Sequence, residues 1–492
     1  MAEKSPAQKK QKVDTEEDEP DASRGLVAYA HWRTHNWTGN VTFKSKSVLT
    51  PASLDQLQSA VNEAGQVRVV GRGHSFTPLC ECEGGLLISL AAMNSVLSFS
   101  PPQTSESGAL LPGTVMVEGG TTYTELIHYL THEIHPPCAL KNLSSLPQAT
   151  IAGACATGTH GSGIHNQNLA THVTAIEFVT SDGKLAQYDK DNSPEEFQGA
   201  VVNLGCLGVV SKISLEVVPW FNGHNFLFDV ELEDLWENFM IDLAGPHPIC
   251  DAFSVLILDW KKDVATVLMR CFVPHWNPSV AASHPDPSAG KLWKTGKAKN
   301  EPSLFDPEGK KGSNWHGPWH DLVSVFIEDG IEDDLGEGQF NNCGQQAEFF
   351  VPVESAVASI RAIQGILKTW SVGDIEDPKN DAGILYSTEL RVVKGDAAWL
   401  SQHPVDSFAI HFNMNGRSSR LAEIERELAR VEQALAPFGV RAHWGKLGPQ
   451  SFQADRLSNL YGDALAKFKK LAERHDPAGK FRNSWVRSVL GF

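Results

Sequence analysis

The first part of the chain, up to about residue 219, alternates short apolar runs with amphipathic stretches. Period-two and continuous apolar patterns predict strands at 67–70, 86–90, 115–120, 173–180 and 207–219. Helical periodicity predicts helices at 53–65 and 122–133. For the first helix, Ser53 and Gln56 fit a capping box and Gly65 fits a terminating glycine. The irregular mixture of strands and helices favours the α+β class.

From residue 220 the pattern changes to longer strands and longer helices. Strands are predicted at 226–232, 253–260, 265–273, 322–329 and 347–353, and helices at 354–370 and 419–435. This order predicts an antiparallel sheet with helices packed on one face. Residues 274–318 are rich in Pro, Gly, Ser, Asp and Lys, and we expect them to form a long surface excursion.

Two further strands of this second part place polar side chains opposite an apolar face. In 384–393 the alternation puts Ile384, Tyr386, Thr388, Leu390 and Val392 on one face and Leu385, Ser387, Glu389, Arg391 and Val393 on the other. In 408–414 it puts Phe408, Ile410, Phe412 and Met414 on a core face and His411 and Asn413 on the opposite face.

These polar faces allow two interpretations. Each is compatible with the solvated face of a strand, and Glu389 with Arg391 is compatible with a surface ion pair. Together with His443 and Lys446 of the HWGK segment, they are also compatible with one polar wall. Such a wall suits a ligand dense in hydroxyl groups, because each hydroxyl both donates and accepts hydrogen bonds.

Two glycine-rich loops lie in the first part of the chain. GRGHSF, residues 71–76, follows the strand at 67–70, and its N–H groups can form a nest for anionic oxygens. Alone it is as compatible with a simple turn, and it lacks the third glycine of the Rossmann fingerprint. The second loop, SSLPQATIAGACATGTHGSG at 144–163, adds four glycines and several hydroxyl side chains. Two such loops predict a long, phosphate-bearing ligand lying across both.

Length, charge and cysteine usage limit the class of protein. A chain of 492 residues predicts two domains. The net charge of −17 disfavours nucleic acid and anionic membranes as partners, so backbone N–H groups must hold the phosphates. The 8 scattered cysteines show no zinc-like spacing and indicate reduced thiols, with no metal site expected. We found no membrane-spanning or signal sequence and expect a cytoplasmic monomer.

The N-terminal segment, residues 1–30, is charged and poor in apolar residues. It cannot bury a core, so we expect a disordered tail. Its KKQKV stretch is compatible with a nuclear-import signal or with an ordinary solvated charge run.

The motifs resemble those of FAD-linked oxidases of the vanillyl-alcohol-oxidase type. Within that superfamily the resemblance is closer to alditol (xylitol, sorbitol) oxidases. It runs in order through NWTGNVTF, VRVVGRGHSF, SSLPQATIAGACATGTHGSG, NLGCLGVVS, GPWHDL, TELRVV, WLS, AIHF, HWGK and DPAGKF. It covers nearly the whole chain after about residue 35.

The resemblance implies a fold and a division into domains. It implies a two-part FAD-binding domain of the vanillyl-alcohol-oxidase (PCMH) type at 36–219 and a substrate, or cap, domain at 220–440. Residues 441–492 would return to the flavin site.

The resemblance also assigns site residues. It implies a covalent bond from His74 to the flavin. The residues it assigns to the cofactor are Val70, Gly71, Arg72, Gly73, His74, Ser75, Ser145, Thr150, Gly153, Thr157, Gly158, Thr159, His160, Val210 and His443. Those it assigns to the substrate are Ser145, Glu389, Arg391, His411, Asn413 and Lys446.

Two of these positions depart from the family pattern. Asn413 stands where bacterial alditol oxidases have threonine, and Arg72 replaces a smaller residue. The change at Asn413 bears on which polyol is preferred more than on the reaction.

The reaction implied is oxidation of a terminal hydroxyl of a polyol to the aldose, with hydride transfer to flavin N5 and reduction of O₂ to hydrogen peroxide. Arg391 and Lys446 would stabilise the developing alkoxide, and a Lys446 of lowered pKa could take the proton. Glu389 would hold the substrate in register. The alternatives are an aldonolactone oxidase or dehydrogenase, whose members share several of these motifs, and a flavin-loaded interaction protein without activity.

Overall fold

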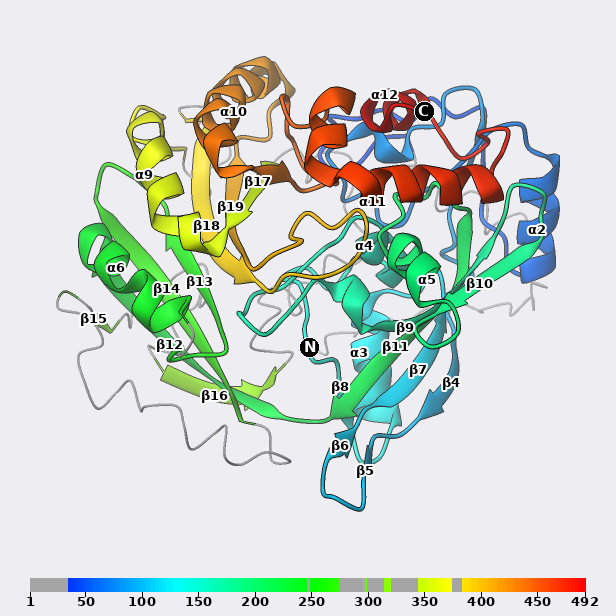
Figure 1. Cartoon of the computed structure of the whole chain (residues 1–492), viewed down its shortest axis with the longest axis horizontal. Coiled ribbons are helices and arrows are strands. Elements are labelled where there is room, and N and C mark those ends of the chain that lie inside the picture. The colour runs from blue at the N-terminus through cyan, green and yellow to red at the C-terminus, as the bar shows by residue number, and fades with distance from the viewer. Residues whose placement is uncertain are drawn as a thin grey trace, which may run out of the picture.

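The computed structural model describes residues 34–245, 248–273, 295, 297–298, 314–319, 344–373 and 383–492. The N-terminal tail, the strand predicted at 322–329 and most of 274–318 lie outside these residues. The described chain forms two halves side by side, with the N-terminal elements in one and the long strands from β12 onwards in the other (Figure 1). Among its helices, none combines the length and apolarity that a bilayer crossing requires.

A small parallel sheet carries the first glycine loop. Its strand order is β1-β3-β2. The bounds are β1 Ser47–Leu49, β2 Val67–Val69 and β3 Leu86–Ile88, with helix α2 at Leu54–Glu63. Leu57 and Val61 of α2 pack against Val67 and Ile88 in one apolar cluster. The first glycine loop therefore leaves a strand that is fixed by its own small core.

The ends of α2 differ from the sequence prediction. Ser53 accepts a hydrogen bond from the Gln56 amide, but the Gln56 side chain accepts from Ala52 instead of closing a capping box. The helix ends at Ala64 in an extended conformation (φ −74°, ψ 144°), so the predicted glycine cap at Gly65 is wrong. Once the chain turns directly into β2, it has no need for a left-handed residue.

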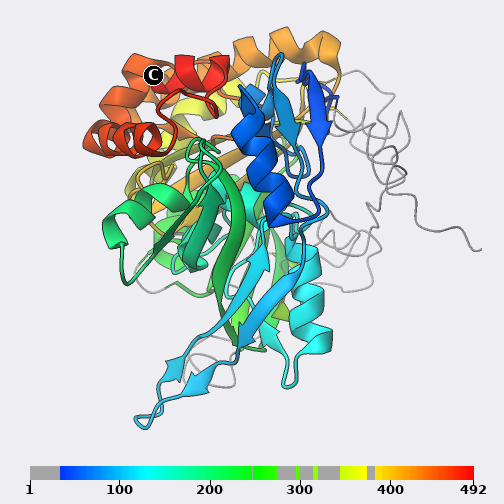
Figure 2. The same ribbon diagram turned by 90° about the vertical axis from the view of Figure 1, so that its right-hand side faces the viewer.

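A six-stranded antiparallel sheet forms the second layer of this half, in the order β10-β9-β11-β7-β4 with β8 beside β11. Its strands are β4 Val96–Ser100, β7 Gly113–Glu118, β8 Cys138–Ala139, β9 Val173–Val179, β10 Leu185–Asp189 and β11 Val209–Pro219. Its helices are α3 Tyr123–His128, α4 Ile151–Ala156 and α5 Pro194–Val201, and a π-helix at Tyr129–Glu133 extends α3. A hairpin of β5 (Gln103–Thr104) and β6 (Leu110–Leu111) projects from it (Figure 2).

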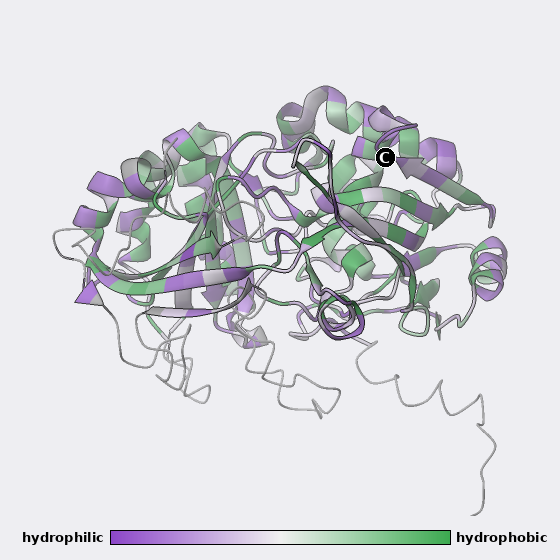
Figure 3. Ribbon diagram, turned by 90° about the horizontal axis from the view of Figure 1, so that it is seen from below, coloured by the Kyte–Doolittle hydropathy of each residue, from purple (hydrophilic) through white to green (hydrophobic). Residues whose placement is uncertain are grey.

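The other half is built on a nine-stranded antiparallel sheet, in the order β15-β12-β14-β13-β18-β19-β17-β20 with β16 beside β12. Its strands are β12 Asn222–Glu231, β13 Ala252–Ile257, β14 Val264–Val273, β15 Lys297–Ala298, β16 Asn314–Pro318, β17 Gln345–Pro352, β18 Leu385–Val393, β19 Ser407–Met414 and β20 Arg441–Ala442. Helices α6 Leu232–Asn238, α9 Ala356–Leu367 and α10 Leu421–Leu435 pack on it through one shared apolar core. Figure 3 shows hydrophobic residues gathered inside each half.

The C-terminal helices return to the first half. Helix α11 spans Ala454–His475 with a kink at Gly462, and α12 spans Ser484–Leu490. Their apolar residues belong to the same core as β9 and β11. The amide of Val67 donates to the Lys480 carbonyl, so the chain end is tied to the strand before the first glycine loop.

A β-bulge in β18 changes one predicted face. The pairing with β19 shifts between Leu385 and Ser387. As a result Leu385 lies in the apolar core and Tyr386 lines the cavity described below, the reverse of the predicted alternation. Beyond the bulge the alternation holds, because Leu390 and Val392 are in the core while Glu389 and Arg391 face the cavity.

Candidate active site

A cavity of about 660 Å³ lies where the two halves meet, and the first glycine loop forms part of its wall. Gly73 adopts a left-handed conformation (φ +70°), which turns the chain so that His74 faces the cavity. The backbone amides of Gly71, Gly73, His74 and Ser75 donate no hydrogen bond to any residue in the described ranges. This loop therefore offers free N–H donors to an anionic ligand.

The loop is held from two sides. On one side the turn at 36–40 clamps it: the Trp37 amide donates to the Gly73 carbonyl (3.0 Å), and Asn36 Nδ2 donates to the Ser75 carbonyl (2.9 Å). On the other side the Phe76 amide donates to the Gly445 carbonyl at 2.7 Å. The segment that carries Lys446 is therefore bonded directly to the loop that carries His74.

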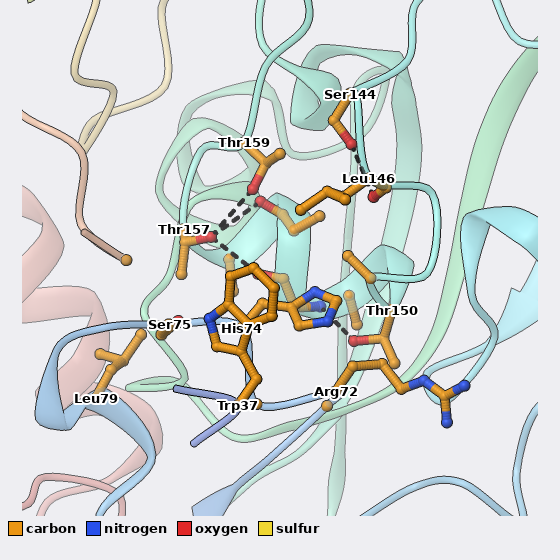
Figure 4. Close-up of a pocket in the computed structure, with 18 of the residues that line it drawn as sticks. Trp37, Arg72, His74, Ser75, Leu79, Ser144, Leu146, Thr150, Thr157 and Thr159 are labelled. Carbon is orange, nitrogen blue, oxygen red and sulfur yellow. Dashed lines mark hydrogen bonds between the residues drawn. The ribbon is translucent and has the colours of Figure 1, made fainter. Parts of the chain in front are cut away.

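The imidazole of His74 is held beside an indole ring. Its centroid lies 5.1 Å from that of Trp37 at an interplanar angle of 57°, and Figure 4 shows Thr150, Thr157 and Thr159 around the same space. Burial, with Arg72 second, lowers the pKa of His74 to about 4. The ring is therefore neutral near pH 7 and keeps a nucleophilic nitrogen lone pair.

The second glycine loop lies against the first and lines the same cavity. Thr150 caps helix α4 by accepting from the Gly153 amide, and the Thr157 hydroxyl donates to the Gly153 carbonyl. Further along, the Gly163 amide donates to the Val392 carbonyl of β18 at 2.8 Å. The loop thus runs from the flank of the first loop to the large sheet and fixes one half against the other.

A third segment also lines the cavity; it begins the NLGCLGVVS motif, but the sequence analysis did not assign it to the site. It contains Asn203, Leu204 and Gly205, and the guanidinium of the buried Arg68 donates to the carbonyls of Leu204 (2.8 Å) and Gly205 (3.0 Å). Leu204 has a positive φ of 53°, a rare conformation for a side chain of this size. The two glycines of NLGCLG indicated a turn. The contact with Arg68 spans more than 130 residues, so the local sequence did not predict it.

The large sheet presents its polar face to the same cavity as two rows of register partners. The first row runs across β17, β19 and β18 as Glu348, His411 and Glu389. The second row runs beside it through the three residues Gln346, Asn413 and Ser387. All six line the cavity, with Arg391 next to the first row. The predicted polar wall is therefore present, and it is wider than the sequence analysis indicated.

Glu348 is one of the residues in this cavity that sequence reasoning missed, together with Gln346 of the same wall and Arg270 of β14. It is 1% exposed, and its carboxylate accepts from Arg391 (2.9 Å) and contacts His160 Nε2 (3.1 Å) and Lys446 Nζ (3.1 Å). Burial alone would raise its pKa, but Lys446, His160 and Arg391 hold the pKa of Glu348 well below its usual range. The alternation in QQAEFFVPV, which buries Ala347, Phe349 and Val351, was the signal that would have placed it here.

His411 brings a ring nitrogen with no described partner into this wall. Its Nε2 has no hydrogen-bond partner among the described residues, while its Nδ1 lies 3.9 Å from the Glu389 carboxylate. Burial, and next the charge of Lys446, hold the pKa of His411 well below 6.5. Burial also lowers the pKa of Lys446, although the Glu348 carboxylate opposes that shift.

The predicted site residues gather in this cavity with a single exception. Its lining contains Val70, Gly71, Arg72, Gly73, His74, Ser75, Ser145, Thr150, Gly153, Thr157, Thr159, His160, Val210, Glu389, Arg391, His411, Asn413, His443 and Lys446. Gly158 is not in the lining. It has φ +66°, and a Cβ there would come within 2.3 Å of the Gln402 side chain. Gly158 is therefore needed for the turn of the second glycine loop and for its close packing against Gln402, not for lining the cavity.

The cavity fits an extended dinucleotide. Its volume lies within the usual range for ligand sites. The glycine loops provide free backbone amides and threonine hydroxyls, which suit phosphates. The large sheet provides charged and amide side chains at the other end of the cavity. A Cβ at Gly71 would stand 2.3 Å from Thr150 Oγ1, so the two loops approach each other as closely as glycine allows.

We expect Gly71→Ala to weaken flavin retention and to destabilise the fold by about 1–3 kcal/mol. The added methyl group would force Thr150 to move, and Thr150 would then lose its cap on α4. Flavin content after gel filtration and thermal unfolding would measure both effects. Gly65→Ala is the matched control, because no atom lies within 4 Å of a Cβ there. If Gly71→Ala and Gly65→Ala had the same flavin content and the same unfolding temperature, the close contact between the two glycine loops would not matter for flavin binding.

Comparison with known protein families gives two matches. A family described as an FAD binding domain matches residues 45–188, and one described as D-arabinono-1,4-lactone oxidase matches residues 342–489. The first covers both glycine loops, and the second covers Glu348, Glu389, Arg391, His411 and Lys446.

Among curated proteins, the chain is 30% identical over 470 residues to an alditol oxidase of Streptomyces sp., covering 92% of this chain and 98% of the relative. It is 30% identical over 469 residues to the L-gulonolactone oxidase of Mus musculus (92% and 97%). It is 24% identical over 469 residues to an L-gulono-1,4-lactone dehydrogenase of Mycobacterium tuberculosis (93% and 98%).

Proposed function

Because the chain belongs to the FAD-linked oxidases of the vanillyl-alcohol-oxidase type, we propose that it oxidises a terminal hydroxyl of a polyol such as xylitol or sorbitol to the aldose. O₂ is the electron acceptor and is reduced to hydrogen peroxide. In this proposal residues 36–219 bind the FAD and the sheet of residues 220–440 binds the polyol. Residues 441–492 place Lys446 in the cavity beside both ligands. The observation that carries the proposal is that two rows of polar side chains face the cavity lined by both glycine loops.

The composition of the wall suits a chain of hydroxyl groups. Each hydroxyl of a polyol donates one hydrogen bond and accepts others, so its site needs both kinds of partner. Glu389 and the Asn413 carbonyl oxygen accept, while Arg391 and Lys446 donate. Asn413 Oδ1 and Arg391 Nε have no hydrogen-bond partner in the described part of the chain. Ser145, across the cavity, supplies a further hydroxyl.

The reaction removes a hydride from the carbinol carbon and a proton from its oxygen. FAD held in this cavity would supply the acceptor for the hydride, with O₂ as the final electron acceptor. His411 Nε2 is placed to take the proton, because it is unpaired, neutral and in the cavity wall. A weak base suffices, because Lys446 and Arg391 stabilise the alkoxide and thereby make the hydroxyl proton more acidic.

The charged residues beside His411 stabilise the charges that develop during the reaction. Lys446 and Arg391 donate to the substrate oxygen and stabilise the negative charge that develops on it. Glu389 lies 3.9 Å from His411 Nδ1 and stabilises the imidazolium that forms. Lys446 is ion-paired with Glu348 at 3.1 Å, so we assign it the stabilising role and His411 the role of base.

A second candidate function is oxidation of an aldonolactone. It is favoured by the lactone-oxidase family that matches residues 342–489 and by the relatives that carry lactone names. Peroxide formation from xylitol, sorbitol and L-gulono-1,4-lactone distinguishes the two. We expect turnover with the polyols at a higher kcat/KM; a higher kcat/KM with the lactone would favour the second candidate.

We also propose that His74 binds the flavin covalently. The ring is neutral and lies in the cavity beside Trp37, and no described residue forms a hydrogen bond with its nitrogens. Acid precipitation of the wild-type holoenzyme should leave yellow colour in the pellet, and His74→Ala should release it to the supernatant. Colour that washes out of the wild-type pellet would contradict the bond.

A further inference from the structure

We infer that Glu348 is a positioning residue that keeps Lys446 protonated and aligned for the reaction. The inference rests on the proposed function for its consequence in catalysis, but the charge relation itself is independent of the substrate. Both oxygens of Glu348 already bind protein groups, Oε1 binding Arg391 and His160 and Oε2 binding Lys446, so we assign Glu348 a role through these groups.

Glu348 joins three segments that are distant in sequence. His160 comes from the second glycine loop, Arg391 from β18 and Lys446 from the segment bonded to the His74 loop. A single carboxylate on β17 therefore fixes the groups that would surround the reacting end of a substrate. Loss of its charge would affect all three at once.

The charges around Glu348 explain why Lys446 depends on it. Facing this region are the cations Arg391, Lys446 and Arg270, the carboxylate of Glu389 and the buried imidazoles His160, His411 and His443. Lys446 is removed from water and lies near a second cation, and both effects disfavour its ammonium form. Among the groups that favour the ammonium form, Glu348 acts most strongly and Glu389 less. Without Glu348, Lys446 would therefore lose its proton at a lower pH.

The test is a direct titration of Lys446 in the holoenzyme. Competitive labelling with acetic anhydride across a pH series, read by mass spectrometry of the peptide containing Lys446, reports the fraction of free amine. In Glu348→Gln we expect the labelling midpoint to fall by about one to three pH units. Glu354→Gln is the matched control, because Glu354 is an exposed glutamate on the same segment. A midpoint in Glu348→Gln equal to that of the control would overturn the inference.

Glu348→Asp guards against misfolding of the first variant. Aspartate keeps the negative charge, but its side chain is shorter by one methylene, so the carboxylate lies farther from Lys446. The labelling midpoint of Lys446 should therefore fall by a smaller amount than in Glu348→Gln. An unchanged midpoint there would count against the inference in the same way.

A second readout separates this inference from the proposed function. The rate at which xylitol bleaches the bound flavin without oxygen should fall at high pH as Lys446 loses its proton. This alkaline limb should move to lower pH in Glu348→Gln. It should be absent from Lys446→Arg, with or without Glu348→Gln, because a guanidinium does not lose its proton in this range. If Glu348→Gln lowers the labelling midpoint but polyols never bleach the flavin, the role of Glu348 stands and the polyol assignment fails.

Discussion

Replacing His411 with asparagine should slow reduction of the bound flavin by a polyol about 10²–10⁴-fold, the usual contribution of a general base. Asparagine retains a polar group of similar size but cannot take up a proton. The bound flavin and the fold should be retained, because His411 is joined to its neighbours mainly by strand pairing and its Nε2 has no partner among the described residues. Anaerobic stopped-flow measurement of flavin bleaching gives the rate directly.

The control for this variant is His165→Asn, at an exposed histidine outside the cavity lining. We expect wild-type rates from it. The pH dependence provides a second check: because burial and Lys446 hold the pKa of His411 well below 6.5, the wild-type rate should stay level as pH falls through that value. An acid limb centred near 6.5, or a His411→Asn rate within a few-fold of wild type, would exclude His411 as the base.

Lys446→Met should slow the same step about 10²–10³-fold, the cost of removing one donor from a developing oxyanion. Methionine preserves the length of the side chain but removes the charge that Lys446 directs at the substrate oxygen. The variant also leaves Glu348 with one cation fewer, so we expect a lower unfolding temperature. Flavin content and thermal unfolding, measured in parallel, separate the loss of rate from the loss of stability.

Lys467→Met is the control, since Lys467 forms a surface pair with Glu195 and its side chain is 52% exposed. It should leave both the rate and the unfolding temperature close to wild type. If Lys446→Met bleaches its flavin as fast as the wild type while remaining folded, Lys446 has no part in stabilising the oxyanion.

Local periodicity was sufficient where one strand has one buried face. It placed His411 and Asn413 opposite the core residues Phe408, Ile410 and Phe412, as the structure has them. It failed at the bulge in β18, because one extra residue exchanged the faces of Leu385 and Tyr386. A bulge depends on the partner strand, and the sequence of β18 alone does not reveal it.

The parts of the site that sequence reasoning missed depend on contacts distant in sequence. Glu348 was read as part of an apolar strand, although the same alternation would have placed it beside His411. The segment at 203–205 is fixed by the guanidinium of Arg68, and the His74 loop is fixed by Asn36 and Gly445. These contacts join segments that are distant in sequence, so no local pattern encodes them.

Anaerobic addition of xylitol to the holoenzyme tests most directly the claim that the glycine loops hold a flavin against the polar wall. The account predicts that xylitol removes the visible absorbance of the oxidised flavin and that admitting air restores it with formation of hydrogen peroxide. A flavin that stays oxidised with xylitol and sorbitol but is bleached by L-gulono-1,4-lactone, or by none of them, would contradict the account.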